Sequence, residues 1–254
     1  MSNLNTNRTL NELVELVEAD LNKRLKYMPD DFNNQQREAL EMFKQRIFLE
    51  EVIEETISFN RLINWEDINS NLKLVSNAEE LIEVFKLRSD IFHEVGYQNA
   101  FPDKIEGLNF DKYDMKSAII YCTNNNEATG TLRLIFDSNN KLPSDSIMSF
   151  DYLRKEYNNI AELSRNIIKQ QTNKLGLEFK YLMGGVHNLF SNNDIDMTIS
   201  GIKTDHYKLC SKFGGMEILK EVESYGDLNQ SSLIIAWDLS KISKFFKKAI
   251  LNQR

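Results

Sequence analysis

The sequence predicts an α/β fold, with a mixed sheet flanked by helices and a helical extension at the N-terminus. Apolar residues recur at steps of three and four before residue 60. After residue 71, short β-branched runs bounded by turn residues alternate with helix-like segments. A hydrophobic content of 41% suffices for a buried core. We therefore expect a helical extension at residues 1–70 and an α/β domain at residues 71–254.

The N-terminal extension is predicted to contain two amphipathic helices. In the first, one apolar stripe is formed by Leu10, Leu13, Val14, Val17, Leu21, Leu25 and Met28. Pro29 ends it, and a second helix is expected at about 33–59. Such helices need a partner in water. That partner is either the main domain or a second copy of the chain, which leaves open a homodimer through the N-terminal helices.

The main domain is predicted to begin with a strand at 72–75 and a helix at 76–93 with a capping pair, Ser76 and Glu79. An irregular segment follows at 96–114. The remaining elements are expected as a hairpin at 117–136, a short helix near 150–157, strands at 160–168, 195–199, 216–220 and 233–239, and helices at 173–190, 205–213 and 241–251. This order fits a sheet that is antiparallel in its first half and has a parallel pair in its middle.

Two predicted strands carry charge inside apolar runs. Arg133 lies in the run 129–136, and Glu162 and Arg165 lie in the run 160–168. Burying an unpaired charge costs more than a strand can recover, so these groups should be paired or face a wet cavity. A structural ion-pair network and a catalytic cleft both satisfy that requirement.

Bulk properties exclude several classes of protein. The net charge of -7 argues against nucleic-acid binding as the main function. No apolar run approaches the ~20 residues needed to cross a bilayer, and the N-terminus lacks a signal-peptide core, so we expect no stable membrane insertion. Cys122 and Cys210 lack disulfide-scaffold or zinc spacing, which favours reduced thiols in the cytoplasm.

Other catalytic motifs are missing. Ser164 lacks the Gly-x-Ser-x-Gly elbow of a serine hydrolase. His93, His187 and His206 stand in no metal-ligand spacing, so no metal is expected.

Four charged pieces in order resemble the GNAT-fold acyltransferases, and within them the acyl-homoserine lactone synthases and long-chain N-acyl amino acid synthases. They are Leu87-Arg88 with Phe92 to Tyr97, Phe110-Asp111-x-x-Asp114, Gly130-Thr131-Leu132-Arg133-Leu134 and Glu162-Leu163-Ser164-Arg165. The likeness spans about residues 74–240. It implies a GNAT-like sheet that transfers an acyl group from a thioester to an amine.

Two departures from the family pattern refine that expectation. Tyr97 stands where the lactone synthases usually have tryptophan, which favours an N-acyl amino acid synthase over an enzyme that uses S-adenosylmethionine. The segment 170–176 has a single glycine, whereas a pyrophosphate loop needs several for close approach of its amides. Acyl-carrier protein is therefore favoured over coenzyme A as the donor.

The resemblance and the chemistry together assign roles. Glu162 is the candidate base for the amine, with Arg133 and Arg165 beside it as catalytic residues. Strict alternation separates Glu162 from Arg165, so a β-bulge is predicted around 163–164. The other substrate-binding candidates are Arg88, Phe92, Tyr97, Asp111 and Asp114. Arg88 and Arg133 would take the acceptor's carboxylate, and the two aspartates would hold the arginines or the amine.

The leading hypothesis is an N-acyltransferase that moves a fatty acyl group from acyl-carrier protein, or coenzyme A, to an amino acid or related amine, with no tightly bound cofactor. The acyl tail would lie against the helix at 173–190 and the strand at 195–199. An acyl-homoserine lactone synthase using S-adenosylmethionine is one alternative. A non-catalytic acyl-binding scaffold is another.

Overall fold

The computed structural model describes residues 9–24, 27, 29–169, 176–223, 228 and 230–251. The chain divides into two compact units, residues 1–52 and 53–254. The domain boundary expected at residue 70 stays a prediction. Most of the glycine-poor segment considered as a pyrophosphate loop, residues 170–175, lies outside the described residues.

The first unit consists of helix α1 (Leu10–Arg24) and most of helix α2 (Asp30–Asn60). A reciprocal pair of hydrogen bonds between Thr9 and Glu12 caps the start of α1. Lys44 of α2 donates to Glu18 of α1 at 3.1 Å. Both helices predicted for this extension are therefore present.

The second unit is built on a seven-stranded sheet with the order β1-β2-β3-β4-β5-β7-β6. The strands are β1 (Leu72–Leu74), β2 (Ser117–Asn124), β3 (Glu127–Phe136), β4 (Ile160–Ile168), β5 (Met197–Lys203), β6 (Met216–Val222) and β7 (Ser232–Trp237). Neighbouring strands are antiparallel except for β4 and β5, which are parallel. The mixed sheet with a central parallel pair, predicted from the sequence, is confirmed.

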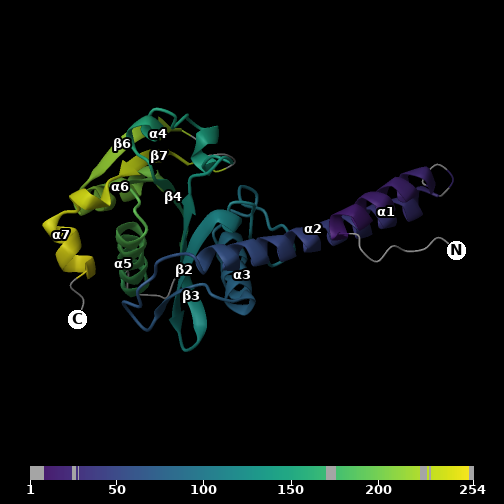
Figure 1. The fold of residues 1–254 in the computed structure, drawn as a ribbon, viewed down its shortest axis with the longest axis horizontal. Helices are drawn as coiled ribbons and strands as arrows, with labels where there is room; N and C mark the ends of the chain where they lie inside the picture. The colour runs from purple at the N-terminus through teal and green to yellow at the C-terminus, as the bar shows by residue number, and fades with distance from the viewer. Residues whose placement is uncertain are drawn as a thin grey trace. The chain divides into compact units, whose positions relative to one another are not determined.

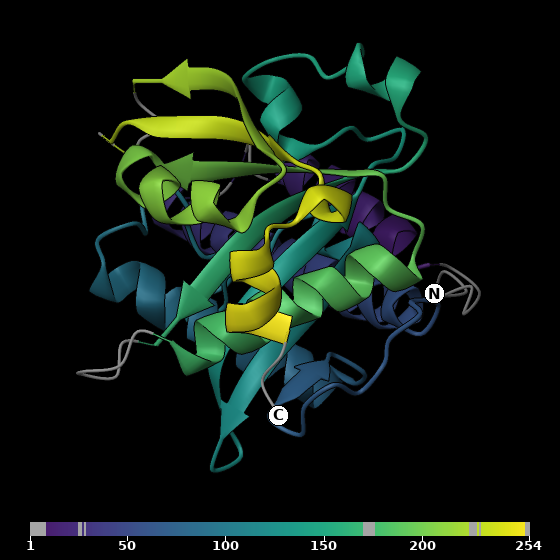
Figure 2. The ribbon, with the colours of Figure 1, turned by 90° about the vertical axis from the view of Figure 1, so that its left-hand side faces the viewer.

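Helices cover both faces of this sheet (Figure 1). Helix α3 (Ala78–Glu94) lies on one face, and α5 (Leu177–Asn192), which connects β4 to β5, lies on the other. The remaining helices of this unit are α4 (Leu153–Glu156), α6 (Thr204–Cys210), and α7 (Lys244–Phe246) with a π-helical turn at Lys247–Leu251. Figure 2 shows α5 and the C-terminal turns on the same face. No helix in the described ranges is long and apolar enough to cross a membrane.

Two helix predictions differ in detail from the structure. The N-cap of α3 is Asn77, whose side chain accepts from the Glu80 backbone amide, one residue later than the predicted pair. The Glu80 carboxylate in turn accepts from the Ser76 amide, because it can reach back over the first turn. The predicted C-terminal helix begins at Lys244 instead of Lys241, because Ile242 is extended, and from Lys247 it continues as the π-helical turn.

The register of β3 and β4 decides which side chains share a face. Ile135 pairs with Glu162, and Arg133 pairs with Ser164. Alternation therefore places Arg133 and Glu162 on the same face. Leu134 and Leu163, between them, belong to the core cluster that includes residues of α5, on the other face.

Strand β4 carries the predicted bulge, but further along than predicted. Thr131 pairs with Ile167 and Arg133 with Ser164, so the extra residue of β4 lies between Ser164 and Ile167 rather than at 163–164. Arg165 there has φ 53°, a left-handed conformation. On its other edge β4 pairs with β5 from Ile160 to Leu163, and beyond that point the two strands no longer pair.

Candidate active site

A cavity of about 470 Å³ opens beside the bulge in β4, where the pairing with β5 has ended. Its walls include six of the eight predicted site residues: Phe92, Tyr97, Asp111, Arg133, Glu162 and Arg165. Arg88 and Asp114 have no exposed surface and lie outside this lining. The charges predicted to face a cleft therefore do so, with Arg88 and Asp114 behind them.

The three arginines and two aspartates form one continuous ion-pair chain. Arg88 Nη1 lies 2.8 Å from Asp114 Oδ1, and the same oxygen lies 3.0 Å from Arg133 Nη1. Arg133 Nη1 also lies 2.7 Å from Asp111 Oδ1, while Asp111 Oδ2 is 3.0 Å from Arg165 Nη2. The charges thus alternate from helix α3, through the loop before β2, to strands β3 and β4.

This alternation makes burial of the charges tolerable, because each carboxylate is shared by two guanidinium groups. Burial favours the neutral form of Asp111, but Arg133 and Arg165 outweigh it and hold the pKa of Asp111 well below its usual range. Burial and the nearby Arg133 lower the pKa of Arg165 to about 10, which leaves it charged at neutral pH. Three positive and two negative groups leave an excess of positive charge at the cavity.

Arg165 packs against two aromatic rings. Its guanidinium carbon lies 4.3 Å from the centre of the Phe101 ring and 5.2 Å from that of Phe92, and these rings stack on each other at 4.9 Å. The bulge therefore brings Arg165 to the same cavity as Glu162, as the sequence argument required.

Glu162 is 2% exposed. Its carboxylate accepts two hydrogen bonds from Ser144, in the loop between β3 and β4. Ser144 donates its backbone amide to Oε2 at 3.0 Å and its hydroxyl to Oε1 at 2.8 Å. Burial raises the pKa of Glu162 to about 7, although the Ser144 hydrogen bonds and Arg133 oppose the rise. Near neutral pH this carboxylate can therefore exchange a proton.

The far wall of the cavity contains residues that the sequence analysis did not assign to the site. Tyr97, a predicted site residue, donates its hydroxyl to Gln230 Oε1 at 3.0 Å, and the Lys203 ammonium lies 5.0 Å from its ring centre. Lys203 and Gln230 both line the cavity. A lysine at the end of an apolar strand is a weak sequence signal. Ser144 gave no sequence signal, because it lies in a polar connection that resembles any solvated loop.

Comparison with known proteins decides the family. The family model for the N-acyl amino acid synthase FeeM matches residues 83–238. The chain belongs to the FeeM N-acyl amino acid synthase family. The matched range contains every predicted site residue and the cavity, so the ion-pair chain and Glu162 lie in the family's own domain.

Solved structures share the fold of this FeeM-family chain. FeeM from uncultured soil microbes is 17% identical, with 71% of this chain and 94% of that chain covered and a TM-score of 0.54. The acyl-homoserine lactone synthase LasI is 16% identical over 72% and 95%, with a TM-score of 0.53. The coenzyme A-dependent acyl-homoserine lactone synthase BjaI is 18% identical over 69% and 82%, also with 0.53. No curated protein matches the sequence.

FeeM-family membership makes the protein an acyltransferase that acts on an amine, which confirms the predicted class of enzyme.

Two details of the expected site differ from the structure. Arg88 does not reach the cavity surface, because it is fully buried against Asp114. The expected acyl slot along α5 and residues 195–199 is not part of this cavity, since Ile195, Met197 and Ile199 are buried in the core.

The raised pKa of Glu162 predicts a pH-dependent stability. Between the unfolded pKa near 4.5 and the folded pKa of about 7, the folded protein binds more protons than the unfolded chain, so the free energy of unfolding falls as pH rises. A shift of that size corresponds to about 3 kcal/mol. Glu162→Gln keeps the side-chain shape without this titration, so urea unfolding of the variant should lose less stability between pH 5 and pH 8 than the parent protein.

Equal slopes for the two proteins would contradict the raised pKa. Glu127→Gln is the matched control, because Glu127 is an exposed carboxylate at the hairpin end of β3 and should leave the slope unchanged.

Proposed function

We propose that the protein transfers a fatty acyl group from the thioester of acyl-carrier protein to the amine of an amino acid. The observation that carries the proposal is Glu162, a nearly buried carboxylate with a pKa of about 7, at a cavity formed where β4 and β5 separate. A base of that pKa is matched to proton transfer at neutral pH. The cavity supplies room for an acceptor beside it.

In the proposed reaction the amine nitrogen attacks the thioester carbonyl carbon. A carbon–nitrogen bond forms and the carbon–sulfur bond breaks. Glu162 takes the proton that the amine loses, and that proton leaves with the thiolate as a thiol. Because Glu162 is half ionised near pH 7, it can accept the proton from one substrate and release it to the other product.

The negative charge that develops on the carbonyl oxygen needs donors already in position. Beyond Leu163, the edge of β4 that pairs with β5 earlier along the strand is open. We assign the backbone amides on this edge to the oxyanion. The excess positive charge of the arginine chain adds a favourable field at the same place.

The acceptor's carboxylate is assigned to Lys203 rather than to Arg88 or Arg133. Arg88 is buried, and the Arg133 guanidinium is already held by Asp111 and Asp114. Lys203 instead lies over the face of Tyr97 on the cavity wall, where its ammonium can turn toward a ligand. An acceptor carboxylate at Lys203 would direct the amine across the cavity toward Glu162.

The choice of donor follows from the segment before α5. A pyrophosphate is held by closely approaching backbone amides, which require glycines, and residues 170–176 contain a single glycine. We therefore propose acyl-carrier protein as donor in preference to coenzyme A. Cys122 and Cys210 are free thiols, which suits a cytoplasmic location for the reaction.

Acyl transfer itself is tested with the full chain, acyl-carrier thioesters or acyl-coenzyme A of several lengths, and a pool of amino acids. We expect thiol release and a product whose mass is that of the fatty acid plus the amino acid less water, with faster turnover of the carrier-protein thioester. Glu162→Gln should lower turnover 10²- to 10⁴-fold. Glu127→Gln again serves as the control.

Absence of thiol release with every donor and acceptor would overturn the acyltransfer proposal and leave an acyl-binding scaffold. Turnover with S-adenosylmethionine alone, included as a separate acceptor, would instead place the protein with the lactone synthases.

Replacing Lys203 with methionine should weaken acceptor binding while leaving the base in place. The apolar stem is retained and the charge is lost, so we expect the KM for the amino acid to rise about tenfold with little change in kcat. Amidated and free forms of the same amino acid separate the charge effect from loss of packing. If the variant discriminates between them as the parent does, Lys203 does not bind the carboxylate.

The N-terminal helices are proposed to mediate a homodimer. Leu16 and Val17 of α1 and Phe32, Met42 and Phe43 of α2 are exposed at 43% to 58%, so both helices present apolar side chains to which a second copy could bind. Light scattering of the full chain should give twice the monomer mass. Leu16→Ser with Phe43→Ser should return it to the monomer mass with acyl transfer retained. A monomeric parent protein would contradict the proposal.

A further inference from the structure

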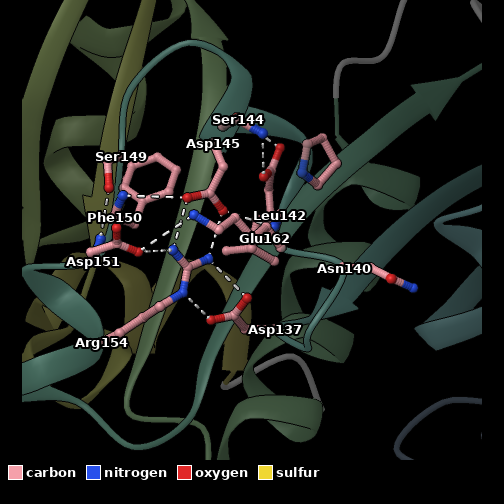
Figure 3. A network of polar contacts seen from close by, with 12 residues as sticks. Asp137, Asn140, Leu142, Ser144, Asp145, Ser149, Phe150, Asp151, Arg154 and Glu162 are labelled. Carbon is pink, nitrogen blue, oxygen red and sulfur yellow. Dashed lines mark hydrogen bonds and ion pairs between the residues drawn. The ribbon is translucent and has the colours of Figure 1, made fainter.

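The loop between β3 and β4 holds a second polar network, outside the ion-pair chain of the arginines. Arg154, on α4, lies between two carboxylates of this loop (Figure 3). Its Nε and Nη2 contact Asp137 at 2.6 and 2.9 Å, and its Nη1 and Nη2 contact Asp145 at 2.8 and 2.6 Å. A further contact, to Asp151, is 3.2 Å long. Each of the two main contacts is bidentate, which fixes orientation as well as distance.

This clamp ties together the start, the middle and the end of the connection at residues 137–159. Asp137 follows β3 directly, Asp145 lies in the 3-10 turn Pro143–Ser146, and Arg154 lies near the end. A connection of this length without a strand of its own needs such ties to hold one conformation. The Asp145 carboxylate also accepts from the Leu142 amide at 2.8 Å, which secures the beginning of the turn.

Ser144, next to Asp145 in that turn, makes both hydrogen bonds to Glu162. Figure 3 shows the two neighbouring residues of the turn, with Ser144 joined to Glu162 and Asp145 joined to Arg154. Ser144 is fully buried, so water does not replace these hydrogen bonds if the turn shifts. The position of Ser144 thus depends on how firmly Asp145 is held.

We propose that Arg154 is a positioning residue for Glu162: by clamping Asp137 and Asp145 it holds the turn that presents Ser144 to the Glu162 carboxylate. The inference rests on the proposed function for its catalytic consequence, but the geometry it invokes is independent of it. Arg154 forms its hydrogen bonds and ion pairs with Asp137, Asp145 and Asp151 and does not line the cavity. Its effect on the reaction is therefore exerted through the loop.

The direction of the effect follows from the groups around Glu162. Ser144 stabilises the charged form, so losing its hydrogen bonds raises the pKa of Glu162 further. Loss of Arg154 also frees the negative charge of Asp145, which acts in the same direction. The other charged or titratable groups nearby are Arg133 from β3, Arg165 from β4, and Asp111 and Tyr113 from the loop before β2. None of these contacts Arg154, so their influence should persist.

The alternative is that apolar packing alone fixes the loop. Leu142, Phe150 and Leu153 are buried in the core cluster beneath it. If that packing suffices, Arg154 contributes stability and leaves Glu162 unaffected. The two cases differ in the titration of Glu162.

The test is a titration of the Glu162 carboxyl by ¹³C NMR in the full chain, with the signal assigned by its loss in Glu162→Gln. Arg154→Ala should raise the midpoint by about one pH unit, the size expected for losing a hydrogen bond to a charged group. The acidic limb of kcat/KM for acyl transfer should move by the same amount, with activity recovered at higher pH. Arg154→Lys keeps the positive charge but cannot make the bidentate contacts, so its midpoint should lie between those of the parent protein and Arg154→Ala.

Lys141→Asn is the matched control. It removes an exposed ion pair with Asp151 in the same loop, and asparagine tolerates the positive φ of 58° at this position. Its titration midpoint should equal that of the parent protein. Ser144→Ala supplies a second route if Arg154→Ala does not fold, since it removes one of the two bonds directly and should also raise the midpoint.

An unchanged midpoint in Arg154→Ala would overturn the inference, whatever the activity. Shifted midpoints in a protein with no acyl transfer would uphold the positioning role and refute the proposed function instead. Lower activity at every pH with an unshifted midpoint would mark Arg154 as structural, and so would also overturn the inference.

Discussion

Arg133 stands near the centre of a seven-stranded sheet with 2% of its surface exposed, and the surrounding structure follows from keeping that charge there. A guanidinium group at such a position needs more than one carboxylate, because the energy of desolvation is large. Asp111 and Asp114, in one turn of the loop before β2, each supply a carboxylate to it. Since the same aspartates also pair with Arg165 and Arg88, one requirement fixes a helix, a loop and two strands relative to one another.

Buried ion pairs seldom add net stability compared with apolar residues of the same shape. The arginine chain is therefore better understood through what it does for the cavity than as a brace alone. It leaves an excess positive charge beside Glu162, and so moderates the rise in pKa that burial of that carboxylate would otherwise cause. The fold thus keeps a carboxylate out of water without forcing it to remain protonated at neutral pH.

The sequence was most informative where a charge interrupted an apolar run. Arg133, Glu162 and Arg165 could be recognised in this way, and alternation then predicted both a shared face and the need for a bulge. The place of the bulge could not be predicted, because Arg165 there is left-handed and packs against two rings from other segments, and neither feature leaves a local pattern in β4. Ser144 gave no signal either, since a serine in a polar loop looks the same whether it faces water or a buried carboxylate.

The features that could be predicted and those that could not differ for one physical reason. Strands supply rigid register, and register can be deduced from local periodicity, but the surroundings of the Glu162 carboxylate also depend on two irregular segments. The loop before β2 acts through the aspartates on Arg133, and the loop after β3 acts through Ser144. Each loop is anchored by an arginine carried on a helix, Arg88 on α3 and Arg154 on α4. Because neither anchor lines the cavity, the acceptor that we propose to bind at the wall of Tyr97 and Lys203 can differ without a change in the groups that hold Glu162.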